Sequence, residues 1–411
     1  MADFYQTGVV ATLHRLQTGN LDALTAQLER HARRRRIALV LPCLIDELDR
    51  PALAHIVDEL TRVRYLDTIV VSLGRASAAD YERAMSFFSR LPQKVRIIWL
   101  EGPRVQALYD QLADADLLPS RTGKGLACWI GYGYVLAEAT CSVIAVHDCD
   151  IVTYSREMLA RLCYPIVDPN VDFEFAKGYY SRVSDRLNGR VTRLFFTPLV
   201  RSLQTIVGRA PFLVYLDSFR YALAGEFAMR ADLARSNRIP SDWGLEVGVL
   251  GEIYRNCALK RICQTELCEN YDHKHQVLSA GDPTAGLTKM CVDIAQNLIR
   301  TLAAEGFVFT DGVFKTLLVQ YIRTAQDTIT RYHADAAINS LPFDRHEEEV
   351  IVAAFAEALK LACQRYIEDP LGAPLIPNWS RITSALPTFL DDLLQAVTSD
   401  AGLVGGTSRD G

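Results

Sequence analysis

The sequence has little excess charge and no long apolar run. Its 44 lysines and arginines against 49 aspartates and glutamates give a net charge of −5, which argues against a nucleic acid as the main partner. No apolar stretch reaches the roughly 18 residues that span a bilayer. The first residues also lack the charged start and apolar core of a secretory signal. We therefore expect a soluble, cytoplasmic protein without a membrane span.

The ten cysteines include no Cys-x-x-Cys pair. They are scattered through apolar stretches, which is typical of buried, reduced thiols in a cytosolic protein. The sequence also lacks the Gly-x-x-x-x-Gly-Lys-Ser/Thr spacing of a P-loop. No Gly-x-Gly-x-x-Gly follows the first predicted strand, which weakens a dinucleotide-binding interpretation.

What the sequence does contain is a regular alternation of strands and helices. Buried or alternating strands are predicted at residues 37–42, 67–72, 95–100, 143–146, 173–180 and 260–267. Helices are predicted between them, at residues 50–63, 78–91, 126–138 and 242–254. This order implies a mostly parallel, Rossmann-like α/β sheet with helices on both faces.

Both ends of the chain are predicted to be helical. Residues 3–34 show apolar side chains at helical spacing, so two short helices within residues 1–36 are expected to pack on the core. The main α/β domain is expected over residues 37–280. A helical region over residues 281–400 would serve packing, dimerisation or a lid. Residues 401–411 are expected to form a flexible tail.

Two carboxylates follow the strand at 143–146. Side chains alternate along a strand, so Asp148 and Asp150 point to one side and Cys149 to the other. Like charges at this spacing repel unless a cation lies between them, and a divalent cation with oxygen ligands is the usual answer. Strand ends are also where open α/β sheets bind ligands. The alternative is chance, because residues 114–116 repeat the pattern in a polar stretch.

Two glycine-containing segments stand at predicted helix starts. In the first, Gly123 allows close approach to a phosphate and Lys124 adds a positive charge; the alternative is an ordinary turn. The second offers backbone N–H groups, a guanidinium and a hydroxyl to a phosphate or carboxylate; the alternative is an ordinary capped helix. Its residues are Gly189, Arg190, Val191 and Thr192.

Three further side chains are candidates. Glu226 is the one carboxylate in residues 221–230, a stretch of mostly small and apolar residues. Glu246 lies among apolar neighbours with Trp243 one turn before it, and a buried carboxylate without a partner is costly. It is therefore expected at a site or in a salt bridge. His273 is a loop histidine; such residues are usually surface residues, and the Asp-x-Asp pattern favours the alternative of a metal ligand.

Taken in order, these motifs resemble those of retaining GT-A glycosyltransferases that make glucosyl-3-phosphoglycerate or mannosyl-3-phosphoglycerate. The motifs are strand-Pro42, Gly123-Lys124-Gly125, Asp148-x-Asp150, Gly189-Arg190-Val191-Thr192, Ala224-Gly225-Glu226, Trp243-Gly244-x-Glu246-x-Gly248 and His273. The resemblance covers roughly residues 37–280. It implies a GT-A fold and a nucleotide-sugar and acceptor-binding catalytic domain over that range, followed by the helical extension.

The resemblance implies a role for each candidate. Asp148, Asp150 and His273 would bind Mg²⁺ or Mn²⁺, with Asp150 as the direct ligand. The nucleotide would be bound by Pro42, Glu47, Gly123, Lys124, Asp148 and Asp150. The acceptor and the transferred sugar would be bound by Gly189, Arg190, Val191, Thr192, Glu226, Trp243 and Glu246. Lys124, Asp150 and Glu246 would then be the catalytic residues.

The implied reaction moves a hexose, with glucose favoured, from a sugar nucleotide to 3-phosphoglycerate with retention. UDP-glucose is the first choice of donor and GDP-mannose the second. The open alternatives are mannosyl transfer, direct transfer to glycerate, a nucleotidyltransferase, and an inactive regulator that binds sugar nucleotides. A homodimer is expected.

Overall fold

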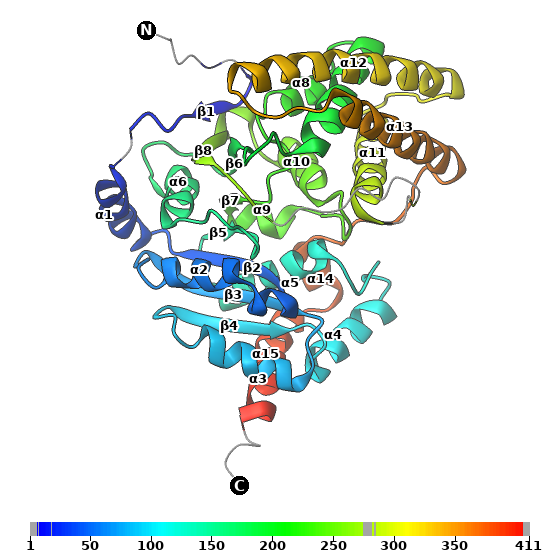
Figure 1. The fold of residues 1–411 in the computed structure, drawn as a ribbon. Coiled ribbons are helices and arrows are strands. Elements are labelled where there is room, and N and C mark those ends of the chain that lie inside the picture. Colours follow the sequence, from blue (N-terminus) through cyan, green and yellow to red (C-terminus); the bar gives the residue numbers. More distant parts are fainter. Residues whose placement is uncertain (1–5, 7, 18, 274–281, 283–284, 406–411) are drawn as a thin grey trace.

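The computed structural model describes residues 6, 8–17, 19–273, 282 and 285–405 (Figure 1). An eight-stranded sheet lies at its centre, in the order β1-β8-β6-β7-β5-β2-β3-β4. The strands are β1 (Ala11–Leu13), β2 (Ile37–Leu44), β3 (Leu66–Gly74), β4 (Lys94–Trp99), β5 (Val143–Val146), β6 (Phe175–Ser181), β7 (Phe227–Arg230) and β8 (Ile262–Asn270). In this sheet only β7 runs antiparallel to its neighbours, β5 and β6. The mostly parallel α/β sheet expected from the sequence is confirmed.

Helices cover both faces of the sheet. Those of the α/β part are α1 (Leu21–Ala32), α2 (Pro51–Leu60), α3 (Ala78–Phe88), α4 (Pro103–Asp114), α5 (Lys124–Glu138), α6 (Arg156–Val167), α7 (Thr197–Val207), α8 (Pro211–Asp217), α9 (Ala231–Ser236) and α10 (Leu245–Asn256), with a π-helical turn, η2 (Val191–Phe196), ahead of α7. Strand β2 shows why the cover is two-sided. Val40 packs into one hydrophobic cluster with α5, whereas Leu39 and Leu41 pack into another with α2 and α6. A strand buried on both faces gives the continuous apolar run seen in the sequence.

The N-terminal segment differs from the two helices expected there. Of its described residues, only Leu21–Ala32 form an α-helix, whereas Ala11–Leu13 form β1 and pair in parallel with β8, Ala11 opposite Cys263. The prediction of a helix before residue 20 is therefore wrong at β1. The apolar residues fit a helical period, but the edge of β8 offers backbone hydrogen bonds that an extended segment takes up.

Beyond residue 285 the described chain is mainly helical. Its helices are α11 (Gly286–Ala304), α12 (Asp311–Ile338), α13 (Arg345–Glu368), α14 (Trp379–Ala385) and α15 (Phe389–Gly405). Helices α11 to α13 pack together and on η2 and α7, whereas α15 runs back against α4 and α5 (Figure 1). Because α15 extends to Gly405, the flexible tail is wrong for residues 401–405; residues 406–411 lie outside the described part. No described helix is long and apolar enough to cross a bilayer.

The C-terminal helices return to α5, the helix that begins at Lys124. Trp379 stacks on Trp129 with ring centroids 4.0 Å apart, and Trp129 Nε1 donates a hydrogen bond to the Pro377 carbonyl at 2.9 Å. Gly133 leaves room for the indole, since a Cβ at that position would lie 2.1 Å from Trp379 Cζ2. The end of the chain therefore fixes the helix that carries the site lysine.

Candidate active site

A cavity of about 1190 Å³ opens where β2, β3 and β5 end, which is where open α/β sheets bind ligands. The start of α5, the start of α10 and the loop before η2 form its other walls. The predicted site residues that line it are Pro42, Glu47, Gly123, Lys124, Asp148, Asp150, Gly189, Arg190, Val191, Thr192, Trp243, Glu246 and His273. Leu287 and Met290 of α11 also line it, so the C-terminal region takes part in the cavity.

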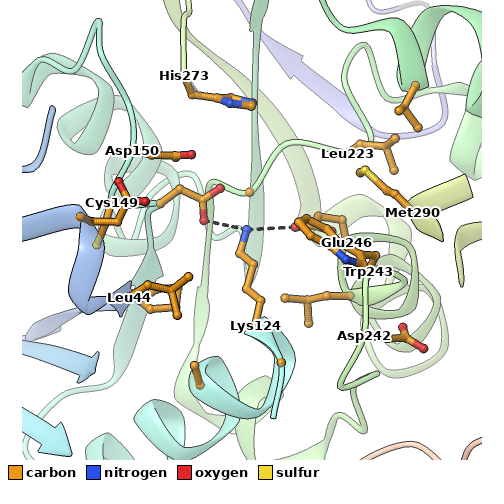
Figure 2. A pocket seen from close by; sticks show the side chains of 18 of the residues that line it. Leu44, Lys124, Cys149, Asp150, Leu223, Asp242, Trp243, Glu246, His273 and Met290 are labelled. Atoms are coloured by element: carbon orange, nitrogen blue, oxygen red, sulfur yellow. Dashed lines mark hydrogen bonds and ion pairs between the residues drawn. The ribbon is translucent and has the colours of Figure 1, made fainter. Parts of the chain in front are cut away.

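Lys124 is the centre of this site (Figure 2). Its Nζ lies 2.6 Å from Asp148 Oδ1 and 3.1 Å from Glu246 Oε1. Burial opposes a charge on the lysine, but the two carboxylates outweigh it and raise the pKa of Lys124 well above its ordinary value. The same ammonium outweighs the effect of burial on the Asp148 carboxyl and lowers the pKa of Asp148. Lys124 and Asp148 are therefore both held in their charged forms.

The backbone at the start of α5 explains how Lys124 reaches this position. Gly123 has φ +115°, and a Cβ there would lie 2.0 Å from the Ser241 carbonyl oxygen. A residue with a side chain is excluded on both counts. A lysine in the first turn of a helix opposes the helix dipole. Its place between two carboxylates compensates for this cost and indicates a role in binding or catalysis.

Asp150 lies in the same wall without a cation of its own. No lysine, arginine or histidine of the described chain forms an ion pair with it. Burial, followed by the negative charge of Asp148, raises the pKa of Asp150 to about 7. A buried carboxylate held in this way gains from a divalent cation with oxygen ligands. The donor set therefore fits Mg²⁺ or Mn²⁺.

His273 stands above Asp150 on the same side of the cavity (Figure 2). Its backbone forms an antiparallel bridge with Ile151, the residue after Asp150. The His273 imidazole also acts electrostatically on the Asp148 carboxylate. The predicted ligands therefore share one wall. They are not assembled into a coordination shell, since no three His, Cys, Asp or Glu side chains of the described residues are close enough together to hold a metal; Lys124 binds Asp148 instead.

Glu226 lies behind the cavity wall. Its fully buried carboxylate accepts hydrogen bonds from the Tyr180 and Tyr271 hydroxyls, each at 2.7 Å. The two rings stack with centroids 3.8 Å apart, and Tyr271 meets the His273 ring edge-on at 5.6 Å. Glu226 thus fixes a tyrosine that supports His273. Its direct contact with substrate stays a prediction, and its burial argues against such a contact.

The Gly189–Thr192 segment is tied to the start of α13. Arg190 Nη2 donates to Glu347 Oε1 at 2.5 Å, and Arg193 contacts both oxygens of Glu348 at 2.8 and 3.2 Å. Both glutamates stand in the first turn of α13, where the helix dipole favours carboxylates. The segment predicted to bind an anion therefore rests on the C-terminal helices.

Sequence reasoning missed several residues of this cavity. Tyr180, Arg182 and Tyr271 line it and were not singled out, although they stand at the ends of β6 and β8. The positional signal that identified Asp148, the end of a strand in a parallel sheet, would have found them as well. Gly225 also lines the cavity, and it belongs to the Ala-Gly-Glu motif of the family resemblance.

Curated proteins similar to this chain carry one name. The glucosyl-3-phosphoglycerate synthase of Persephonella marina is 48% identical over 97% of this chain and 99% of its own length. That of Methanococcoides burtonii is 40% identical over 97% of this chain and 98% of its own. The enzyme of Mycolicibacterium smegmatis is 26% identical over 59% of this chain and 72% of its own. No family model matches the chain.

Solved structures of similar fold come from Mycobacterium tuberculosis. Its glucosyl-3-phosphoglycerate synthase in complex with Mn²⁺, UDP-glucose and phosphoglyceric acid has a TM-score of 0.53 and 22% identity, covering 72% of this chain and 89% of that one. The same enzyme with Mg²⁺ and UDP gives a TM-score of 0.52 and 22% identity, covering 74% and 89%. At this identity the likeness shows the fold.

The sheet and the Asp-x-Asp after β5 define a protein of the GT-A fold. The full-length similarity to the P. marina and M. burtonii proteins narrows this class. The chain belongs to the glucosyl-3-phosphoglycerate synthase family.

Proposed function

We propose that this chain transfers glucose from UDP-glucose to 3-phosphoglycerate, giving glucosyl-3-phosphoglycerate, with Mg²⁺ or Mn²⁺ as cofactor. Membership of the family supports the substrates. The observation that carries the chemistry is the position of Lys124 between Asp148 and Glu246, at 2.6 and 3.1 Å, beside the carboxylate of Asp150.

The donor half of the cavity stabilises a leaving diphosphate. Negative charge grows on the diphosphate as the bond to the sugar breaks, and a divalent cation bound at Asp150 and His273 offsets it. Lys124 adds a fixed positive charge on the other side of Asp148, with no proton to transfer. Pro42 in β2 and Glu47 after it line the cavity and would bind the uracil base.

The acceptor half holds the attacking hydroxyl. Glu246 faces the cavity from the first turn of α10 and would hold hydroxyls of the glucose ring, with Trp243 at its side. The backbone of Gly189, the Arg190 guanidinium and the Thr192 hydroxyl would bind the phosphate of the acceptor. Positioning then brings the acceptor hydroxyl to the sugar's anomeric carbon on the face from which the diphosphate departs, in keeping with retention.

A product assay tests this function. UDP-glucose and GDP-mannose are each incubated with 3-phosphoglycerate or glycerate in the presence of Mg²⁺ or Mn²⁺, and the products are identified by mass spectrometry. We expect glucosyl-3-phosphoglycerate and UDP from the first pair. Pyrophosphate release from a nucleoside triphosphate would instead identify a nucleotidyltransferase. A product from glycerate alone, or donor binding without turnover, would reject the proposed acceptor or the enzymatic role.

Gly225 provides a test that changes no charged residue. A Cβ at this position would lie 2.3 Å from Asp148 Oδ2 and 3.0 Å from Lys124 Nζ. Gly225→Ala should therefore displace both charges and lower kcat by about a hundredfold, the cost of a misplacement of about 1 Å. Steady-state kinetics measures this effect.

Gly251→Ala is the matched control. Gly251 lies in α10 beyond the cavity, and its added Cβ would come no closer than 3.6 Å to Thr301 Cγ2. We expect this variant to keep the wild-type kcat. A Gly225→Ala enzyme as active as the control would show that the Asp148 position does not limit turnover.

A further inference from the structure

We propose that Arg182 binds the carboxylate of the acceptor and so makes the enzyme select an acceptor with two negative groups. This inference rests on the proposed function, because it takes the acceptor to be 3-phosphoglycerate. The carboxylate is the second anionic group of that molecule. Arg182, which would bind it, belongs to none of the sequence motifs described above.

Arg182 directly follows β6 and lies beside the segment proposed to bind the phosphate. A Cβ on Gly189 would lie 3.7 Å from the Arg182 Cβ, and the Asn188 N–H donates to the Arg182 carbonyl at 2.8 Å. The Arg182 guanidinium lies over the ring of Tyr271, with its carbon 5.8 Å from the ring centroid. Arg182 therefore neighbours both the phosphate segment and the tyrosine that supports His273, within the same cavity.

The charge of Arg182 has no carboxylate partner among the described residues. No carboxylate of the described residues forms an ion pair with it, and its buried Nε has no hydrogen-bond partner there. Its Nη1 reaches only the Tyr221 hydroxyl, at 3.4 Å, which is the long end of the hydrogen-bond range. A partly buried guanidinium without a counter-ion is costly. A ligand anion at this position would remove the cost.

Most other cations of the cavity are already paired with a carboxylate. Five of them lie within 4.0 Å of a carboxylate: Arg121 of Asp110, Lys124 of Asp148, Arg186 of Asp185, Arg190 of Glu347 and Lys289 of Asp293. Arg75 is exposed and follows β3, near the end of β2 where the base would bind. Among the described residues that line the acceptor half, Arg182 is thus the cation available for a second anion.

The chemistry of the acceptor requires such a group. In 3-phosphoglycerate the carbon with the reactive hydroxyl lies between the carboxylate carbon and the carbon that carries the phosphate. If Arg190 and Thr192 hold the phosphate, a second donor near Gly189 must hold the carboxylate to fix that hydroxyl. A guanidinium matches a planar carboxylate with two parallel hydrogen bonds. Both ends of the acceptor would then be anchored.

Two ligands that differ only in the carboxylate test this assignment. Glycerol 3-phosphate has a hydroxymethyl group where 3-phosphoglycerate has the carboxylate. Titration calorimetry measures binding of each ligand to the enzyme loaded with UDP and Mg²⁺. We expect Arg182→Gln to lower the affinity for 3-phosphoglycerate by at least about tenfold, which corresponds to the loss of a charge-assisted hydrogen bond. Binding of glycerol 3-phosphate should stay within about twofold.

Two control variants separate this inference from the proposed function. Arg190→Gln should weaken both ligands, because it acts on the phosphate that they share. Arg186→Gln should leave the ratio of the two affinities unchanged, because Arg186 is exposed and already paired with Asp185. Arg182→Lys keeps the charge without the fork and should fall between wild type and Arg182→Gln; it also serves if the glutamine variant does not fold.

If Arg182→Gln lowers the affinity for both ligands equally, or does not lower the affinity for 3-phosphoglycerate, the role of Arg182 is overturned while the proposed function stands. A wild-type enzyme that binds neither ligand would overturn the proposed function itself. If Arg182→Gln lowers only the affinity for 3-phosphoglycerate and Arg190→Gln leaves the affinity for both ligands unchanged, the role of Arg182 is supported and the phosphate binds at residues other than Arg190.

Discussion

Asp150→Asn is expected to lower kcat by at least about a thousandfold, because it removes the carboxylate proposed to bind the metal directly. The substitution keeps the size of the side chain. It also removes the electrostatic repulsion between two buried carboxylates, those of Asp150 and Asp148. The fold should therefore persist, which thermal unfolding checks. Steady-state kinetics with Mg²⁺ and Mn²⁺ measures the decrease in kcat. EDTA should lower the activity of the wild-type enzyme to a similar degree. Wild-type activity in the variant, or in the presence of EDTA, would contradict the proposed metal site.

The pH dependence of metal binding belongs to the same expectation. Burial and the Asp148 charge raise the pKa of Asp150 to about 7, so below pH 7 this carboxyl carries a proton that the metal must displace. Affinity for Mn²⁺ should fall by about tenfold per pH unit below 7 and level off above it. Calorimetry at pH 6 in buffers of different ionisation enthalpy should detect release of one proton. Asp150→Asn should abolish that release.

Lys124→Gln has the second largest expected effect. Lys124 is the ammonium shared by Asp148 and Glu246, and we propose that it offsets the charge on the leaving diphosphate. Loss of one such preorganised charge lowers kcat by about a hundredfold to a thousandfold. Steady-state kinetics with UDP-glucose as the varied substrate measures it.

Lys124→Arg is the matched control, since it keeps the positive charge and should retain more activity than the glutamine variant. Glutamine at position 124 would leave two carboxylates without their shared cation, so its melting temperature should fall as well. A normal kcat with only a raised KM for the donor would show that Lys124 binds the ground state and does not stabilise the transition state.

The core of the fold was predictable because its strands carry a local signal. Strand β2 is apolar on both faces, and the run of residues 37–42 therefore stood out in the sequence. Strand β1 carries no such signal: its three residues become a strand only because β8, far along the chain, leaves an edge to pair with. Helical spacing and a short extended segment are both compatible with its apolar residues, and tertiary contact decided between them.

The charged residues of the site were predictable, but their partners were not. Asp148 and Asp150 stand at a strand end, and Lys124 stands between two glycines, which are patterns within a few residues. The contacts of Lys124 with Glu246 and of Arg190 with Glu347 join distant parts of the chain. Nothing in either local pattern indicates the other partner. The same holds for Glu226, whose two tyrosines come from β6 and the end of β8.

The stacking of Trp379 on Trp129 ties the identity of residue 133 to the presence of the final helices. A member of this family that lost the final helices would expose the α5 surface beside Gly133, where only hydrogen in place of a side chain leaves space for the indole. Such a lineage should replace this glycine with a larger residue. The identity of one residue in α5 would then serve as a marker of chain length when new members are sorted.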